Sequence, residues 1–331
     1  MSEQAMSAAP TAAPRPASPP VRNLRAWLPL ATLVLLVALV GLLDASFLRP
    51  ANLLTTAADV SALFIMALGL TLVIYVGSID LSSQSVASMT TVLVAVWLAQ
   101  YGVWAMIAAL LIGAAFGALS GLVAMLTRIP TFIATLAMGG VAFSIARFAS
   151  GEKGVSMAEA DRNAVLGWLF GYWGPIPKEI VVALVLLVVL LFIERRTVFG
   201  RVIKAIGAAE LAAVSSGIRV ERYKVAVFAL SGFLAAFAGL MLSARLSGGS
   251  ALAANQFLLP AIVAVLVGGT PLTGGVGGVL NTLIGALIVA VIRASMVYLS
   301  IPAEAQQIFF GLVLIAAIAL TLDRSKVFTV K

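Results

Sequence analysis

The sequence predicts an all-α, polytopic membrane protein of about ten transmembrane helices, with broken or re-entrant segments and both termini in the cytoplasm. Its composition is 62% hydrophobic and only 10% charged, with a mean hydropathy of +1.13, whereas soluble domains carry roughly a quarter charged residues. Apolar runs such as 28–43, 53–76 and 103–126 approach or exceed the ~20 residues that cross a ~30 Å hydrocarbon core as a helix.

The chain is expected to form one membrane domain, residues 26–322, flanked by two cytoplasmic tails. Residues 1–25 are rich in Ala, Pro and Ser and contain no apolar core, which predicts a disordered tail. Because the first apolar run begins only near Ala26, we expect it to remain as an anchor and not to be cleaved as a signal peptide. Residues 323–331 form the second tail.

The spans are placed by the apolar runs between polar or glycine-rich segments. We expect them at about 26–43, 54–77, 83–99, 103–126, 131–149, 179–193, 223–246, 258–269, 275–299 and 305–322. The eighth is too short to cross alone, and the sequence leaves open whether 258–275 crosses or re-enters. Most Lys and Arg residues fall in segments that this order places inside, which supports a cytoplasmic 194–224 loop.

Cysteine and histidine are both absent, so disulfides, thiolate chemistry and the common zinc or haem sites have no ligands here. We therefore expect this chain to bind no metal and no cofactor. The net charge of +8 is interpreted as membrane topology, because in a membrane protein the position of Lys and Arg matters more than their sum. A nucleic-acid partner is not expected.

The longest outer segment, about 150–178, contains Trp168, Trp173 and a Gly174-Pro-Ile-Pro177 turn. It is predicted either to form a short interfacial helix with both tryptophans at headgroup level or to provide a docking surface for an external partner. Both roles are compatible with one segment.

Two glycine-rich breaks interrupt the apolar runs, at Gly77–Ser83 and at Gly268–Gly275. Glycine and proline leave backbone groups that lipid cannot satisfy, so such breaks lie where protein or water surrounds them. We expect them to line a central pathway or its mouth. The breaks also resemble each other, Val76-Gly77 corresponding to Val267-Gly268, as in an internal repeat.

Three ionisable residues in or next to the spans are considered as functional candidates, namely Asp59, Asp80 and Arg293. Asp80 is interpreted either as the N-cap of the third span, accepting from amides near Ser82 and Ser83, or as a polar pathway residue. Asp59 and Arg293 lie toward the outer side, where they pair with each other or Arg293 extends to the interface.

The loop 194–224 concentrates basic residues around a core of small ones, Ala205 to Ile218. Glu210, Ala213 and Gly217 fall at helical i, i+3 and i+7, which predicts a short helix between Gly207 and Gly217 that fits a groove. The basic residues are explained by orientation alone and would also be attracted to anionic lipid.

From about residue 45 to 322 the chain resembles the membrane permeases of bacterial ABC importers for ribose and related monosaccharides, a family that includes autoinducer-2 and sugar-alcohol systems. The matching motifs are Gly77-Ser-Ile-Asp-Leu-Ser82, Pro130-Thr-Phe-Ile-Ala-Thr-Leu136, Thr197-Val-Phe-Gly-Arg201, Ala205-Ile-Gly207, Glu210, Ala212-Ala213, Ser216-Gly-Ile218, Leu230-Ser-Gly232, Gly239, Ala244-Arg245, Gly268-Gly-Thr270, Gly274-Gly275 and Gln306-Gln307. Each motif is short, and their order along the chain is what makes the resemblance specific.

The resemblance implies that 205–218 is a coupling helix seated in a cleft of a cytoplasmic ATPase. The implied contact residues are Gly207, Glu210, Ala213 and Gly217. This chain has Ala208-Ala209 and Val214 where the family commonly has Gly-Asn and a charged residue, and Ser82-Ser-Gln-Ser85 where Ser-Val-Gly-Ser is common. The first departure bears on which ATPase is recognised, the second on the geometry of the first break.

The resemblance further implies a transport subunit of the bacterial cytoplasmic (inner) membrane that is not itself an enzyme. No Gly-x-x-x-x-Gly-Lys-Ser/Thr phosphate loop occurs in the sequence, so ATP would be used by the partner subunit. The implied partners are a cytoplasmic ABC ATPase, a periplasmic or extracellular sugar-binding protein, and a second permease subunit, identical or related. Membrane lipid surrounds the assembly.

The implied cargo is a monosaccharide or related polyol, which suits a pathway lined with hydroxyls, amides and small residues. The candidates for lining it are Ser78, Asp80, Ser82, Thr135, Thr270, Thr273 and Asn281. The alternative is an ion-coupled secondary transporter of a small polar solute, with Asp59, Asp80 or Arg293 as the coupling group. An integral-membrane enzyme is excluded by the lack of any cluster of His, Cys or paired carboxylates.

Overall fold

The computed structural model describes residues 22–321, and these form a bundle of helices without a large sheet. The predicted tail 323–331 and residues 1–21 lie outside the described residues, while Arg22 to Arg25 already belong to the first helix. The ten helices that follow the predicted spans are α1 (Arg22–Leu43), α2 (Pro50–Tyr75), α3 (Ser83–Tyr101), α4 (Val103–Thr127), α5 (Thr131–Ser150), α7 (Lys178–Arg196), α10 (Val220–Leu246), α11 (Leu258–Val267), α12 (Val279–Tyr298) and α13 (Ala303–Thr321).

The predicted all-α membrane fold is confirmed. Within residues 22–321, five helices are long and apolar enough to cross a membrane by length and composition, namely α2, α4, α5, α10 and α12. Shorter apolar stretches occur at Trp27–Leu43, Leu258–Val267 and Ala305–Ile318. With a rise of about 1.5 Å per residue, the ten residues of α11 cover only about half of a ~30 Å hydrocarbon core.

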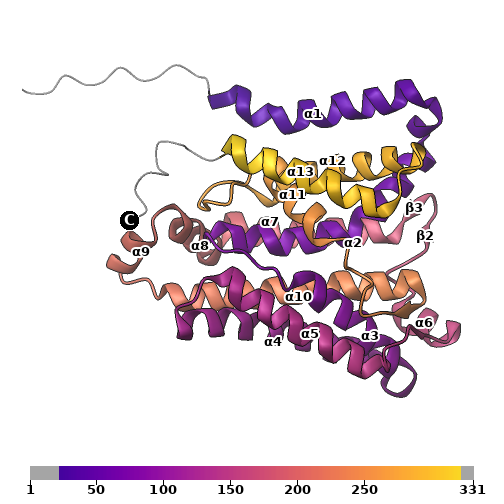
Figure 1. Cartoon of the computed structure of the whole chain (residues 1–331), viewed down its shortest axis with the longest axis horizontal. Helices are drawn as coiled ribbons and strands as arrows, with labels where there is room; N and C mark the ends of the chain where they lie inside the picture. The colour runs from indigo at the N-terminus through magenta and orange to yellow at the C-terminus, as the bar shows by residue number, and fades with distance from the viewer. Residues whose placement is uncertain (1–21, 322–331) are drawn as a thin grey trace, which may run out of the picture.

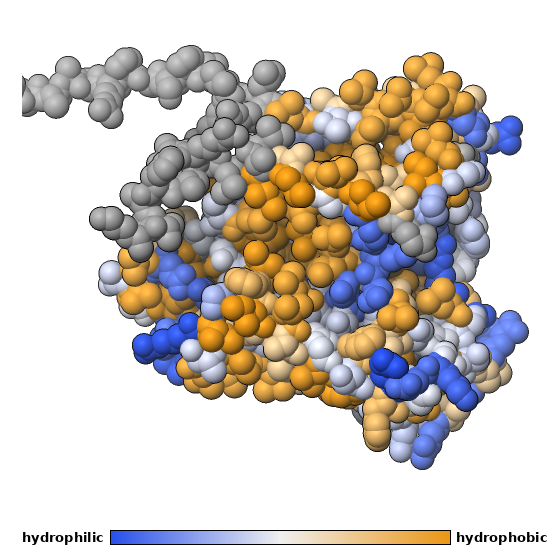
Figure 2. All heavy atoms as spheres, viewed as in Figure 1, coloured by the Kyte–Doolittle hydropathy of each residue, from blue (hydrophilic) through white to orange (hydrophobic). Residues whose placement is uncertain are grey.

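The long helices lie side by side, with the segments predicted to be inside at one end and those predicted to be outside at the other (Figure 1). The inner end carries α8 (Val198–Ala208) and α9 (Glu210–Ser215), and the outer end carries α6 (Glu159–Leu166) and the strands β2 (Tyr172–Trp173) and β3 (Ile176–Pro177). A short 3-10 helix, η1 (Ala45–Leu48), joins α1 to α2, and α1 packs against α12. Figure 2 shows hydrophobic side chains over most of the visible middle of the molecule, as a bilayer requires.

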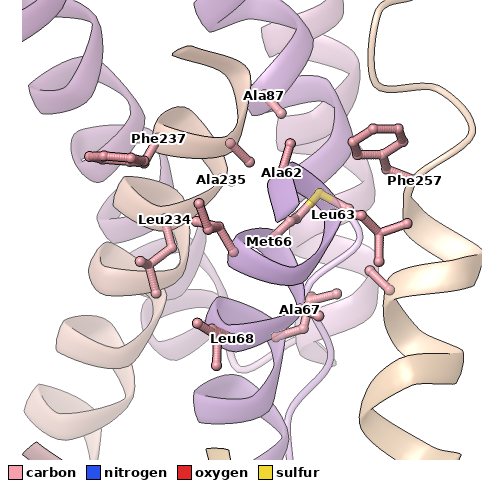
Figure 3. Close-up of a cluster of buried hydrophobic side chains, with 14 of the residues drawn as sticks. Ala62, Leu63, Met66, Ala67, Leu68, Ala87, Leu234, Ala235, Phe237 and Phe257 are labelled. Atoms are coloured by element: carbon pink, nitrogen blue, oxygen red, sulfur yellow. The ribbon is translucent and has the colours of Figure 1, made fainter. Parts of the chain in front are cut away.

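Helix α2 is the centre of the bundle, because 89% of its most apolar window is buried by other parts of the protein. In Figure 3 its side chains Leu63 and Met66 lie among residues of neighbouring elements, with Leu234 and Ala235 of α10 on one side and Phe257, just before α11, on the other. A helix that is apolar all round is buried by other helices, and α2 follows that rule.

Helices α4 and α10 pack through a stripe of glycines. Gly113, Gly117 and Gly121 are spaced four residues apart on α4, and a Cβ on Gly117 would overlap the carbonyl of Phe228 in α10. A Cβ on Gly232 of α10 would in turn overlap the carbonyl of Gly113. Small residues at this spacing let two membrane helices approach at backbone distance.

The outer segment contains the predicted short helix, α6, and is attached to the bundle. Strand β1 (Val155–Ser156) pairs antiparallel with β4 (Gly248–Gly249), which follows the end of α10. The side chains of Trp168 and Trp173 remain 42% and 57% exposed, which is compatible with the headgroup position expected for them.

Candidate functional site

The two predicted breaks have the same backbone geometry. After α2, the Ser78 N–H donates to the Val73 carbonyl and the Gly77 N–H donates to the Ile74 carbonyl. After α11, the N–H groups of Thr270 and Gly269 donate in the same way to the carbonyls of Val265 and Leu266. Both are Schellman ends, with Gly77 (φ +67°) and Gly269 (φ +97°) in the left-handed region. The structural counterpart of Gly77 is therefore Gly269, one residue later than the sequence comparison placed it.

Asp80 lies inside the first break, 1% exposed, and acts on the start of α3. Its Oδ1 accepts from the Ser82 N–H at 2.9 Å and from the Ser82 hydroxyl at 2.6 Å. Its Oδ2 accepts from the hydroxyl of Ser231 on α10 at 2.8 Å. The N-cap of α3 is Ser82 and not Asp80 as the capping interpretation had it. Asp80 lies two residues earlier and accepts from Ser82 itself, and Ser231 adds a link between the break and α10.

Threonines at the start of α5 bind the backbone of the same break. The Ile79 N–H donates to the Thr131 hydroxyl at 3.2 Å, and the Leu81 N–H donates to that of Thr135 at 3.0 Å. These N–H groups cannot pair within a helix or with lipid, so the threonines supply the acceptors that the extended segment needs.

The pathway candidates do not converge on one surface. Ser78, Asp80, Ser82 and Thr135 are buried together at the first break, and Thr270 is buried at the second. Thr273 and Asn281 are exposed on the inner half of the molecule. The Thr270 hydroxyl is buried without a hydrogen-bond partner among the described residues.

The second break reaches the inner end of α2, where the first break begins. The Gly275 N–H donates to the carbonyl of Tyr75, the last residue of α2, at 3.0 Å. A Cβ on Gly274 would come within 2.7 Å of the Gly77 nitrogen, so only glycine fits there without movement. The two breaks are thus in direct contact.

The loop 194–224 contains two helices where one was expected. Helix α8 ends at Ala208, Ala209 is extended (φ −160°, ψ 85°), and α9 begins at Glu210. The four residues implied as ATPase contacts have different environments. Gly207 packs so closely that a Cβ would overlap the Tyr75 carbonyl, and Ala213 is buried.

The exposed part of α9 is formed by other residues. Leu211 is 84% exposed and Val214 is 52% exposed. The Glu210 carboxylate is half exposed and accepts from the ammonium of Lys224 at 2.7 Å, while Gly217 is exposed with φ +78°. Sequence reasoning missed Leu211 on this helix and named Val214 only as a departure from the family pattern.

A buried carboxylate, Glu194, joins α8 to the residues that border both breaks. It lies near the end of α7 with only 5% of its side chain exposed. It accepts from the Tyr75 hydroxyl at 3.1 Å, from the Val279 N–H at the start of α12 at 3.2 Å, and from the ammonium of Lys204 on α8. We call Tyr75, Glu194, Lys204 and Val279 the inner junction.

Lys204 extends the inner junction into the second break. Its ammonium also donates to the Gly277 carbonyl at 3.1 Å and lies 4.8 Å from the centre of the Tyr75 ring. The inner junction thus connects α8 with α2, α7, α12 and the second break. In the sequence, the only indication of the inner junction is that Glu194, at the end of an apolar span, lies ten residues before Lys204.

At the outer end, the structure pairs Asp59 of α2 with Arg245 at the end of α10, and not with Arg293. The Arg293 guanidinium instead lies 5.6 Å from the centre of the Phe257 ring. Asp59, Arg245 and Arg293 border a cavity between α2, α10, α12 and α13.

Comparison with known proteins gives matches along most of the chain. The chain is 36% identical to the ribose import permease protein of Haemophilus influenzae, over 86% of this chain and 90% of that protein. It is 35% identical to the ribose import permease protein of Bacillus subtilis, over 90% and 92%, and 30% identical to the xylose transport system permease protein of Escherichia coli, over 83% and 86%.

These relatives confirm the resemblance to monosaccharide permeases and, with the apolar helices, a multi-pass protein of the inner membrane. The matching family model is described as branched-chain amino acid transport system / permease component and covers residues 52–318. This chain belongs to that family of transport system permease components.

Proposed function

We propose that this chain is the transmembrane permease subunit of an ATP-binding-cassette importer and forms the translocation pathway for a monosaccharide or related polyol. The observation that carries the proposal is the match to ribose and xylose permeases over most of both chains. The alternative, an ion-coupled transporter, loses support because Asp80 holds the start of α3 and Asp59 is paired with Arg245.

The proposed partners follow from the arrangement of the two ends. A cytoplasmic ABC ATPase would bind and hydrolyse ATP, a sugar-binding protein would deliver the cargo outside, and a second permease subunit would complete the pathway. This chain would bind no cofactor and have no ATPase activity of its own. The tails at 1–25 and 323–331 are proposed to lie in the cytoplasm.

The inner junction supports a mechanical role for the loop 194–224. On this proposal, the ATPase contacts α9 through Leu211 and Val214, with Gly207, Glu210, Ala213 and Gly217 shaping and placing the segment. Displacement of α8 then acts on Glu194 through Lys204. Glu194 also bonds to α2 and α12. Movement of α8 is therefore transmitted to both breaks through direct hydrogen bonds.

The pathway candidates fall into two proposed roles. Asp80, Ser82 and Thr135 use their oxygens to hold the first break in shape, with Ser78 buried beside them. Thr273 and Asn281 are exposed on the inner half of the molecule and are proposed to line the exit of the pathway. The buried Thr270 is proposed to support this exit from inside the protein.

The test is reconstitution of the permease with the ATPase and binding protein encoded beside it, in proteoliposomes. We expect uptake of at least one of D-ribose, D-xylose and D-fructose that requires ATP and the binding protein and survives collapse of the proton gradient. Failure of the ATPase to co-purify, or uptake that stops with the gradient while ATP persists, would reject the importer proposal and favour ion coupling.

A further inference from the structure

A cavity of about 350 Å³ lies near the outer ends of α2, α10, α12 and α13, a size within the roughly 300–1,000 Å³ of small-molecule sites. Its polar lining consists of Thr56, Asp59, Arg245, Gln256, Arg293 and Gln306. We call it the outer pocket. Figure 2 shows a hydrophilic area interrupting the hydrophobic surface between the upper and lower helices, toward the end that carries β2, β3 and α6.

The charged groups of the outer pocket contact other side chains of the protein, although the side chains of Asp59 and Arg245 are 54% and 43% exposed. Arg245 is held by Asp59, and Arg293 is held against the Phe257 ring. The Nη1 atom of Arg293 is buried and has no hydrogen-bond partner among the described residues. An arginine that only anchors a helix at the interface places its guanidinium in water, so burial of this nitrogen requires another reason.

The chemistry of the lining matches a polyhydroxylated neutral molecule. The arginines supply donors, the Asp59 carboxylate supplies acceptors, and the amides of Gln256 and Gln306 supply both. Apolar side chains, among them Val60 and Leu242, complete the wall. Sugar hydroxyls need donors and acceptors on several sides, while the C–H faces of the ring need apolar contact.

We propose that the outer pocket is a binding site for the monosaccharide before it passes to the breaks, with Arg293 and the Asp59–Arg245 pair donating to and accepting from its hydroxyls. This inference rests on the proposed function. The site lies at the opposite end of the molecule from the inner junction, so its loss leaves the ATPase contacts in place.

The first experiment measures sugar imported per ATP hydrolysed, in proteoliposomes of the complete complex, with whichever of D-ribose, D-xylose and D-fructose the wild type imports. For Arg293→Gln we expect this ratio to fall at least about tenfold, because a hydrogen bond to a charged donor is lost, while stimulation of the ATPase by the loaded binding protein persists. The matched control is Arg147→Gln, an outer arginine paired with Glu152 at 2.9 Å, for which we expect the wild-type ratio.

A ratio unchanged in Arg293→Gln and in Asp59→Asn would overturn the outer-pocket proposal and leave the proposed function intact. If the wild-type complex imports none of the three sugars, the proposed function itself fails first. The two failures are therefore distinguishable.

A second experiment does not depend on transport and uses the absence of native cysteine. Ala294→Cys places a single thiol in the wall of the outer pocket, and Ala160→Cys places one on exposed α6 as the control. We expect the imported sugar to slow maleimide labelling at position 294 only. Equal rates with and without sugar, or protection by a sugar acid but not by the neutral sugar, would contradict the proposal.

Discussion

Two buried carboxylates, Asp80 and Glu194, organise polar contacts between the helices, and each of the two has several donors. Asp80 receives bonds from Ser82 and Ser231, and Glu194 receives them from Tyr75, Lys204 and Val279. A buried charge is tolerated only when its hydrogen-bonding capacity is used. Removing one partner should therefore cost far more than removing an exposed pair.

The buried Glu194–Lys204 pair and the exposed Glu152–Arg147 pair provide a comparison. Glu194→Ala leaves Lys204 and the Val279 N–H without their carboxylate, and we expect it to lower the free energy of unfolding by about 3–5 kcal/mol. Glu152→Ala removes the exposed partner of Arg147, in a pair whose side chains are 69% and 48% exposed, and should cost no more than about 1 kcal/mol. Thermal unfolding of both variants in detergent micelles measures the difference, and equal midpoints would contradict it.

Ser231 offers a second test at the same scale. Ser231→Ala removes the only bond to Oδ2 of Asp80 among the described residues, and we expect a loss of about 1.5–3 kcal/mol, as for hydrogen bonds to charged groups. Ser144→Ala, whose hydroxyl bonds only to Gly140 of its own helix, should change stability by less than about 0.5 kcal/mol. Chemical unfolding monitored by tryptophan fluorescence would compare them.

At the scale of elements, the contact between α4 and α10 depends on the glycine stripe. Gly117→Ala forces a methyl group into the Phe228 carbonyl, and we expect a destabilisation of about 1–3 kcal/mol or more from overpacking. A Cβ on Gly140 of α5 would meet nothing within 4 Å, so Gly140→Ala should leave stability unchanged or raise it slightly. A lower unfolding midpoint for both variants would contradict this assignment.

The second prediction at this scale concerns helix α9. Leu211→Glu puts a charge on its most exposed apolar residue, and we expect co-purification of the ATPase to fall at least about tenfold, since charge is depleted at interface cores. Leu252→Glu, at a residue that is 57% exposed in the segment after β4, should leave co-purification at the wild-type level. If the Leu211 variant still co-purifies with the ATPase at the wild-type level, α9 is not the contact with the ATPase.

The elements themselves were largely predictable, because hydropathy reports burial in lipid directly. The order of the spans, the short α11 and the break at Gly77 all follow from apolar runs and glycine positions. The bonds to Asp80 from Ser82 were predictable because they are local. The bond from Ser231 was not, because this residue lies 151 residues away in sequence and its contact depends on how α10 packs.

Glu194 shows the limit of sequence reasoning most clearly. Its donors come from α2, α8 and α12, and no local pattern specifies that these elements meet. The glycine stripe, by contrast, carried a signal: Gly113, Gly117 and Gly121 repeat every four residues, a spacing typical of close helix contacts in membranes.

At the scale of the whole molecule, the inner junction and the outer pocket lie at opposite ends of the same helices, α2 and α12. Each end has its own charged residues, and the middle is apolar (Figure 2). In the proposed complex, a sugar bound outside and a partner bound inside would act on shared helices without sharing any side chain.

Helix α10 runs unbroken for 27 residues, from five residues after the end of α9 to the outer strand β4 that pairs with β1. At about 1.5 Å per residue it is a continuous rod of about 40 Å. Where binding at one end changes affinity at the other, the coupling is reciprocal. In the proposed complex, whatever factor the outer protein imposes on nucleotide affinity inside, nucleotide must impose on the affinity for that protein outside.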